Sequence, residues 1–109
     1  MFLKREKEKK QLVNSFDLLH QVILKSEPNP LEVMLDLADL LVEGRGVLAL
    51  FSELDDVEVA NHVLAFLSGV VYALNGSVYQ ISNETYLFAG EEALKDGTLA
   101  QYIKEVGEK

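Results

Sequence analysis

The stretch of residues 31–42 is apolar around most of a helical circumference, and this pattern restricts the possible folds more than any other feature. Its acidic side chains recur at i, i+4, i+7 and i+11 and share one narrow line: Glu32, Asp36, Asp39 and Glu43. A helix that covers one face of a sheet needs an apolar arc of only about 100°. The apolar surface beyond this arc predicts burial against a second protein surface, most simply in a symmetric homodimer. The alternative is burial inside one chain, between the sheet and a terminal helix.

A second core helix is expected over residues 56–68, and it is also apolar on most sides. Asp55 is placed to cap its first turn, with Glu58 three residues later as in a capping box. Between the two helices, the glycines of residues 44–46 end the first one. The continuous apolar run of residues 47–51 then predicts a buried central strand.

After Gly69 the residues become alternating, β-branched and aromatic. Residues 70–74, 77–81 and 85–89 predict three antiparallel strands. Asn75 and Gly76, between the first two, predict a tight hairpin turn in which both residues have positive φ. Residues 82–84 make the next reversal, and a last helix follows, capped by Thr98.

Residues 5–25 predict an N-terminal helix, because apolar residues recur at i, i+4, i+7 and i+11: Leu12, Phe16, Leu19 and Ile23. Pro28 and Pro30 then interrupt the helical pattern. We therefore expect an N-terminal region of residues 1–27 and a core of residues 28–109. The expected fold is an α/β (α+β) two-layer sandwich, with two core helices on a small mixed sheet, an antiparallel β-meander, and N- and C-terminal helices.

The charge of the chain is unevenly distributed. Residues 1–10 hold five basic and two acidic side chains, whereas the rest of the chain holds five basic and sixteen acidic ones, a net charge of −11. Such an acidic body excludes nucleic acid as a partner, because it repels phosphates. The apolar runs all fall short of the roughly 18 residues of a membrane span, and no signal-peptide pattern opens the sequence. We therefore expect a cytoplasmic protein.

Few side chains suggest catalysis. The sequence has no cysteine, which excludes thiol chemistry and Cys-ligated metal sites. Its two histidines, His20 and His62, lie in separate predicted helices without a second ligand beside them. The acidic cluster of Asp55, Asp56 and Glu58 lacks the spacing of a calcium loop, and helix capping explains it. We expect no enzyme, cofactor or metal; a metal-dependent enzyme at this cluster is an alternative that requires a bound cation.

The basic N-terminal tip favours contact with an anionic bilayer through these residues: Phe2, Leu3, Lys4, Arg5 and Lys7. Its net of three positive charges contributes roughly 3 kcal/mol at such a surface, and burial of the two apolar side chains adds ~2–4 kcal/mol. Linked copies gain further affinity through avidity. The alternative is a solvated start to the first helix.

The sequence VLAFLSGVVYALNGS at residues 63–77 resembles a run in the SepF family of bacterial cell-division proteins. The family's closing strand corresponds to YLFAG at residues 86–90, so that the resemblance covers about residues 30–89. It implies a non-enzymatic adaptor that forms dimers and polymers and binds the C-terminal tail of the tubulin-like protein FtsZ. Such a protein tethers FtsZ to the inner face of the cell membrane at the division site. A small dimeric α+β regulatory or ligand-binding domain is the alternative.

The resemblance also assigns site residues. Gln80 corresponds to a basic residue of the family's FtsZ-tail pocket and Tyr86 to its aromatic anchor, with Ile81 and Phe88 forming or flanking the pocket. Because Gln80 is uncharged, contact with a peptide carboxylate is expected to be weaker. Gly69 corresponds to a glycine where family dimers touch, and at a helix end it would allow close backbone approach. Self-association is expected through four residues: Val63, Phe66, Leu67 and Gly69.

Overall fold

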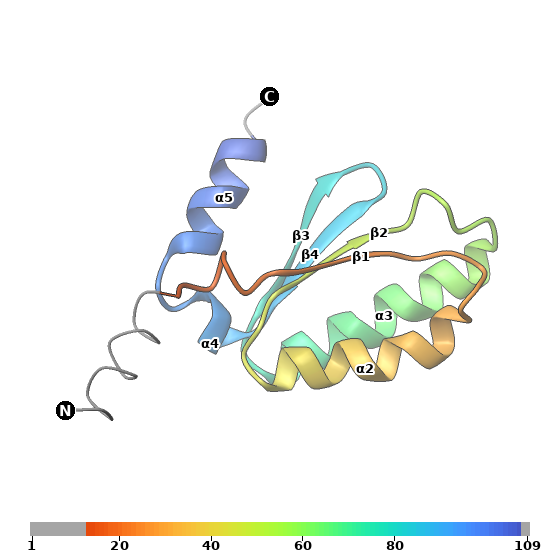
Figure 1. Ribbon diagram of the computed structural model, residues 1–109, viewed down its shortest axis with the longest axis horizontal. Helices are drawn as coiled ribbons and strands as arrows, with labels where there is room; N and C mark the ends of the chain where they lie inside the picture. The colour runs from red at the N-terminus through yellow and green to blue at the C-terminus, as the bar shows by residue number, and fades with distance from the viewer. Residues whose placement is uncertain (1–12, 108–109) are drawn as a thin grey trace.

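The computed structural model describes residues 13–107, which form four helices and four strands (Figure 1). In chain order the elements are β1 (His20–Ile23), α2 (Pro30–Val42), β2 (Val47–Leu50), α3 (Val57–Ala73), β3 (Ser77–Ser82), β4 (Thr85–Ala89), α4 (Glu91–Leu94) and α5 (Thr98–Gly107). Strands alternate with helices in the first half, and a hairpin followed by helices makes up the second half, as in other α+β domains.

The four strands form one mixed sheet in the order β1-β2-β4-β3. β1 runs parallel to β2, whereas β4 pairs antiparallel with both β2 and β3. The predicted central strand is confirmed, because β2 has a neighbour on each side and its residues Val47 and Ala49 are completely buried. β1 and β3 are therefore the two edges of the sheet.

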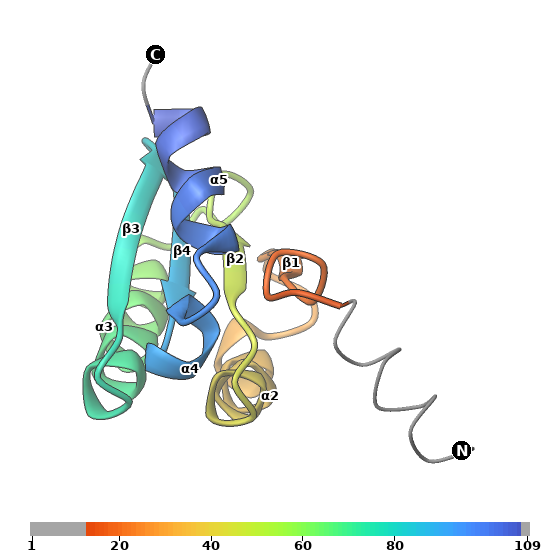
Figure 2. The same ribbon diagram turned by 90° about the vertical axis from the view of Figure 1, so that its left-hand side faces the viewer.

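Helices pack on both faces of this sheet. α2 and α3 lie side by side on one face (Figures 1 and 2) and enclose the larger part of the core, which includes Leu37, Leu41, Val63, Leu67 and Phe88. On the other face, Leu99 of α5 packs with Leu48 and Leu87. The predicted fold class is confirmed: two core helices lie on a small mixed sheet, and a C-terminal helix completes the structure.

Local signals set both ends of α2. The Asn29 side chain accepts a hydrogen bond from the Leu31 N–H at 3.0 Å, and Pro30 occupies the first turn, where no partner for an N–H is needed. At the other end, the Gly44 N–H donates to the Leu41 carbonyl at 3.0 Å. Gly44 has a φ of +95°, the left-handed conformation that favours glycine after a helix. The predicted glycine-rich end of this helix is confirmed.

The helix predicted over residues 5–25 is wrong for the part that the structure describes. Residues 15–18 form a turn, and His20–Ile23 is strand β1, paired with β2; residues 5–12 lie outside the described range. Val22 and Ile23 are β-branched and favour a strand. The local sequence gives no sign that β2 is available as a pairing partner. The spacing of Phe16, Leu19 and Ile23 therefore resembles a helical pattern, although these residues do not lie in a helix.

The strand predicted at residues 70–74 is also wrong, because α3 continues to Ala73. Val63, Leu67 and Val71 are all buried and recur at every fourth residue, so burial against the core extends the helix beyond Gly69. The expected three-stranded meander is therefore the single hairpin β3–β4. The strands predicted at residues 77–81 and 85–89 are confirmed.

Asn75 and Gly76 end α3 instead of joining two strands. Asn75 has a φ of +58°, as predicted, but Gly76 does not have a positive φ. The Gly76 N–H donates to the Val71 carbonyl at 2.7 Å, which completes a Schellman motif. Glycine is required at position 76 because a Cβ there would overlap the backbone carbonyl of Ala89.

The caps of α3 and α5 differ slightly from the prediction. Asp56, not Asp55, caps α3, and its carboxylate accepts a hydrogen bond from the Glu58 N–H at 3.0 Å. Thr98 is the first residue of α5 instead of its cap, and its N–H donates to the Asp96 carboxylate at 3.0 Å. Adjacent polar residues offer alternative caps, so a sequence places a helix start only to within one or two residues.

Candidate functional site

A groove opens between the first half of α3 and the β3–β4 turn, and we call it the Tyr86 groove. Its volume is about 210 Å³. Most of its lining is apolar: Phe51, Leu54, Val57, Ala60, Leu64 and Tyr86. Three polar residues complete it: Asn61, Asn83 and Glu84. This volume is smaller than the roughly 300–1,000 Å³ of small-molecule sites, so the groove suits an inserted side chain better than a cofactor.

Two aromatic rings form part of the wall of the Tyr86 groove. Phe51 and Tyr86 meet edge to face, with ring centroids 5.6 Å apart and an angle of 89° between the ring planes. The Phe51 N–H donates to the Glu84 carbonyl at 2.7 Å, which ties the end of β2 to the β3–β4 turn. The resemblance indicated Tyr86 but not Phe51, whose contact with Tyr86 joins residues far apart in the sequence.

Gln80 lies directly opposite Tyr86 in the β3–β4 pairing, so both side chains project from the same face of the sheet. The Gln80 amide Nε2 donates to the Asn83 carbonyl at 3.3 Å. In this chain, Gln80 therefore braces the turn that carries Asn83 and Glu84. The structure brings these predicted pocket residues, Gln80 and Tyr86, together at one end of the hairpin.

The other two residues predicted for the peptide pocket lie elsewhere. Ile81 belongs to the opposite face of the sheet, where it packs with the cluster around Leu48 and Leu87. Phe88 lies on the same face as Tyr86, but it is completely buried in the core under α2 and α3. Neither residue lines the Tyr86 groove.

The four residues predicted for self-association lie on α3 in different environments. Val63 and Leu67 are completely buried in the core of the chain, whereas Phe66 is half-buried and Gly69 is exposed. Gly69 lies within α3 and not at a helix end, which corrects the expected position. Among the described residues, a Cβ added to Gly69 meets no atom within 4 Å. The described part of the chain therefore leaves the space around Gly69 open, and the expected contact with a second copy stays a prediction.

The outward sides of α2 and α3 carry large apolar side chains that are exposed. Leu35 and Val42 on α2 are 60 % and 66 % exposed, and Tyr72 on α3 is 83 % exposed. α5 lies on the opposite face of the sheet (Figure 2) and does not cover them. Because residues 70–74 were expected to form a strand, the sequence did not indicate that Tyr72 projects outward from a helix. Burial of this surface by a second copy stays a prediction.

The acidic cluster at the start of α3 has a structural role. Asp56 accepts hydrogen bonds from the N–H groups of Glu58 and Val59 at 3.0 and 3.3 Å. Within residues 13–107, no group of three or more potential ligands is placed to hold a metal ion. The histidines are also separate, and His20 begins strand β1 instead of lying in a helix, whereas His62 is exposed on α3.

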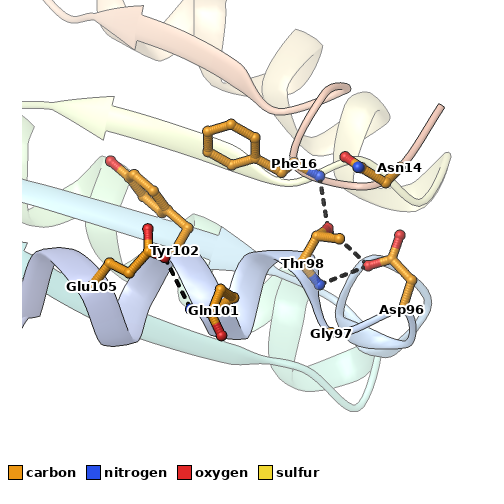
Figure 3. Close-up of a pocket in the computed structure, with 8 residues that line it drawn as sticks. All are labelled: Asn14, Phe16, Asp96, Gly97, Thr98, Gln101, Tyr102 and Glu105. Atoms are coloured by element: carbon orange, nitrogen blue, oxygen red, sulfur yellow. Dashed lines mark hydrogen bonds between the residues drawn. The ribbon is translucent and has the colours of Figure 1, made fainter.

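A second cavity, of about 370 Å³, lies between residues 14–16 and α5 (Figure 3). The rings of Phe16 and Tyr102 line it, with centroids 5.2 Å apart. The Asp96 carboxylate joins the two segments by accepting the Thr98 N–H at 3.0 Å and the Ser15 N–H at 2.8 Å. These two backbone hydrogen bonds lower the pKa of Asp96 from 3.8 to about 2. Because Ser15 and Asp96 are distant in the sequence, no local pattern indicates this site.

The residues predicted for membrane contact lie outside the described part of the chain: Phe2, Leu3, Lys4, Arg5 and Lys7. Within residues 13–107, every helix is too short or too polar to cross a lipid bilayer.

Comparison with known proteins establishes the family of this chain. The family described as "Cell division protein SepF" matches residues 23–93, which is more than half of the sequence. No curated protein matches the chain. The matched region contains the whole Tyr86 groove and all of α3. The chain therefore belongs to the SepF family of cell-division proteins.

Proposed function

We propose that this chain is a non-enzymatic adaptor that binds the C-terminal tail of FtsZ, associates with itself and tethers FtsZ to the cytoplasmic face of the membrane during septum formation. Family membership supports the role in division. The single observation that carries the choice of partner is the Tyr86 groove, an apolar recess lined by the aromatic residue expected to anchor the tail.

The groove suits a short peptide. Its apolar lining buries one anchor side chain of the partner, and a few such anchors supply most of the binding energy in protein interfaces. Gln80 offers no positive charge to a carboxylate of the tail, and its amide is already engaged with the turn. Affinity therefore depends on the apolar anchor at Tyr86 more than on a charge pair at Gln80.

We propose that self-association uses the outward side of α3. Gly69 and the strongly exposed Tyr72 lie one turn apart there, and Phe66 lies at the border of the same surface. A glycine next to a large aromatic side chain allows the backbone of a second copy to approach closely. Val63 and Leu67 support this contact from inside, because they fix α3 on the core.

We propose that the membrane tether is the basic tip, through Phe2, Leu3, Lys4, Arg5 and Lys7. Because a net of three charges gives only roughly 3 kcal/mol at an anionic surface, a single copy binds the membrane weakly. Self-association multiplies the number of tips and so raises the overall affinity. Adaptor function thus requires both the α3 contact and the tip.

Co-sedimentation with FtsZ filaments tests the proposed partner. The full chain is expected to pellet with filaments of intact FtsZ and to remain in the supernatant with filaments of FtsZ that lacks its C-terminal tail. Pelleting to the same extent with both kinds of filament would exclude the tail as the binding partner. Failure to pellet with either would exclude FtsZ binding altogether.

A further inference from the structure

The mouth of the Tyr86 groove is acidic. Glu84 lines the groove, and none of the other lining residues is basic. Further acidic side chains border the lining residues Leu54 and Val57 along the chain: Glu53, Asp55, Asp56 and Glu58. The loop between β2 and α3, the start of α3 and the β3–β4 turn lie at the same end of the molecule (Figure 1).

Nearby positive charge compensates only part of this field. Lys25 pairs with Glu53 at 3.8 Å, and the other ion pair among residues 13–107 joins Lys95 to Glu92 on a different part of the surface. The carboxylate of Glu84 takes part in neither pair. It is exposed at the groove and keeps its charge available for a ligand.

The position of Glu84 is fixed by its backbone. Its carbonyl accepts the Phe51 N–H at 2.7 Å, and the adjacent Asn83 carbonyl accepts the Gln80 amide at 3.3 Å. Both bonds hold the turn against the aromatic floor of the groove. The backbone of Glu84 is therefore held at the rim of the groove, so that its side chain lies within reach of a peptide residue next to the one that packs on Phe51 and Tyr86.

We propose that Glu84 is a specificity-determining residue, which selects peptides carrying a lysine or arginine next to the apolar anchor and disfavours peptides with an acidic residue there. The inference rests on the proposed peptide-binding role of the Tyr86 groove. Its physical basis is charge complementarity. An acidic residue next to the anchor would be repelled by Glu84 and the nearby acidic side chains, whereas a basic residue there would pair with Glu84. A basic residue at position 80 would instead favour an acidic peptide, but this chain has the neutral amide of Gln80 there.

Two matched probe peptides test this selectivity. Both are short, fluorescein-labelled peptides with a central Phe-Leu pair, followed in one by two lysines and in its twin by two glutamates. Fluorescence anisotropy with the full chain is expected to show roughly threefold to fivefold tighter binding of the lysine peptide than of the glutamate peptide. This is the size of effect expected for an exposed charge pair. The preference is expected to shrink in 0.5 M salt, where charges are screened.

Variants separate Glu84 from the general charge of the protein. Glu84→Gln is expected to remove most of the preference and Glu84→Lys to reverse it. Glu91→Gln, which removes one exposed carboxylate on α4, is expected to retain it. Thermal unfolding checks that all three variants fold. An unchanged preference in Glu84→Gln and Glu84→Lys, both folded, overturns the proposal.

The same titrations distinguish this inference from the proposed function. If both peptides bind the wild-type chain equally and Tyr86→Ala weakens both, selectivity by Glu84 is wrong and the groove remains the binding site. If Tyr86→Ala binds both peptides as tightly as the wild type does, the groove is not the binding site and the inference falls with it.

Discussion

At the scale of single residues, Asp96 shows how one carboxylate joins distant parts of the chain. It accepts the N–H of Ser15 and the N–H of Thr98, while the Thr98 hydroxyl accepts the Phe16 N–H at 3.0 Å (Figure 3). Residues 14–16 are thereby fixed to the start of α5. This connection sets where the N-terminal region leaves the body of the protein.

The depressed pKa of Asp96 predicts an acid-sensitive contribution to stability. The pKa of about 2 in the folded protein lies below the ordinary value of 3.8 for an aspartate, so the contribution to stability is present above pH 4 and is lost as the pH falls towards 2. Asp96→Asn is expected to lower the free energy of unfolding at pH 7 by about 1 kcal/mol, because the amide has a single acceptor oxygen and cannot keep both backbone hydrogen bonds. It is also expected to flatten the decline in stability between pH 4 and 2. Urea unfolding at several pH values measures both effects. Asp36→Asn, on the exposed side of α2, serves as the control, and an equal response of both variants would contradict this role.

The residue scale also shows what a sequence reveals about the candidate groove. Tyr86 and Gln80 followed from the family resemblance, and the pairing of β3 with β4 places them together. Alternation along a strand puts Ile81 on the opposite face from Gln80, so its position away from the Tyr86 groove could be predicted from the sequence. Phe51 required the fold, because the β2–β4 contact brings it to Tyr86 from a separate segment. Glu84 stands only two residues before Tyr86 in the sequence, but its place on the groove depends on how the β3–β4 turn folds.

At the scale of elements, α3 is the most informative difference between prediction and structure. The β-branched residues after Gly69 favour a strand locally, yet Val71 continues the buried spacing of Val63 and Leu67. Tertiary burial therefore outweighs local propensity, and Gly69 becomes an exposed residue within a helix. β1 is the reverse case, because a locally helical spacing yields to pairing with β2.

Gly69 predicts a separation of folding from assembly. Lysine has a higher helix propensity than glycine, and the space around position 69 is open, so Gly69→Lys is expected to fold at least as stably as the wild type. Its long charged side chain is expected to block higher assembly, whereas Gly69→Ala is expected to keep it. Light scattering at matched concentrations measures assembly, and thermal unfolding checks the fold. Polymers of unchanged size in Gly69→Lys would show that this surface is not used.

At the scale of the whole molecule, charged side chains are unevenly distributed along the chain. Residues 59–83 contain no Asp, Glu, Lys or Arg, and they form most of α3 and the edge strand β3. Acidic side chains gather instead along α2 and at the start of α3. This division leaves an uncharged side for association, while the negative remainder keeps the body of the protein away from an anionic membrane.

Removal of residues 1–10 tests the role of the basic tip. The remaining chain has a net charge of −11 and is expected to lose binding to vesicles that contain anionic lipids, since roughly 1 kcal/mol per basic side chain is lost. Co-sedimentation with anionic and with neutral vesicles measures this difference. The full chain is expected to bind only the anionic vesicles, more weakly in 0.5 M salt. Equal binding of the full and shortened chains would assign membrane contact to another surface.

The central claim, that the Tyr86 groove binds the FtsZ tail, is tested most directly by calorimetric titration of a tail peptide into wild-type, Tyr86→Ala and Tyr102→Ala proteins. Tyr102 is the matched control, because it is also half-buried but belongs to α5 and lines the second cavity. We expect Tyr86→Ala to bind the peptide at least tenfold more weakly than the wild type, as for the loss of a central anchor. Tyr102→Ala is expected to bind it with wild-type affinity. Equal affinities of the wild type and Tyr86→Ala would contradict the central claim.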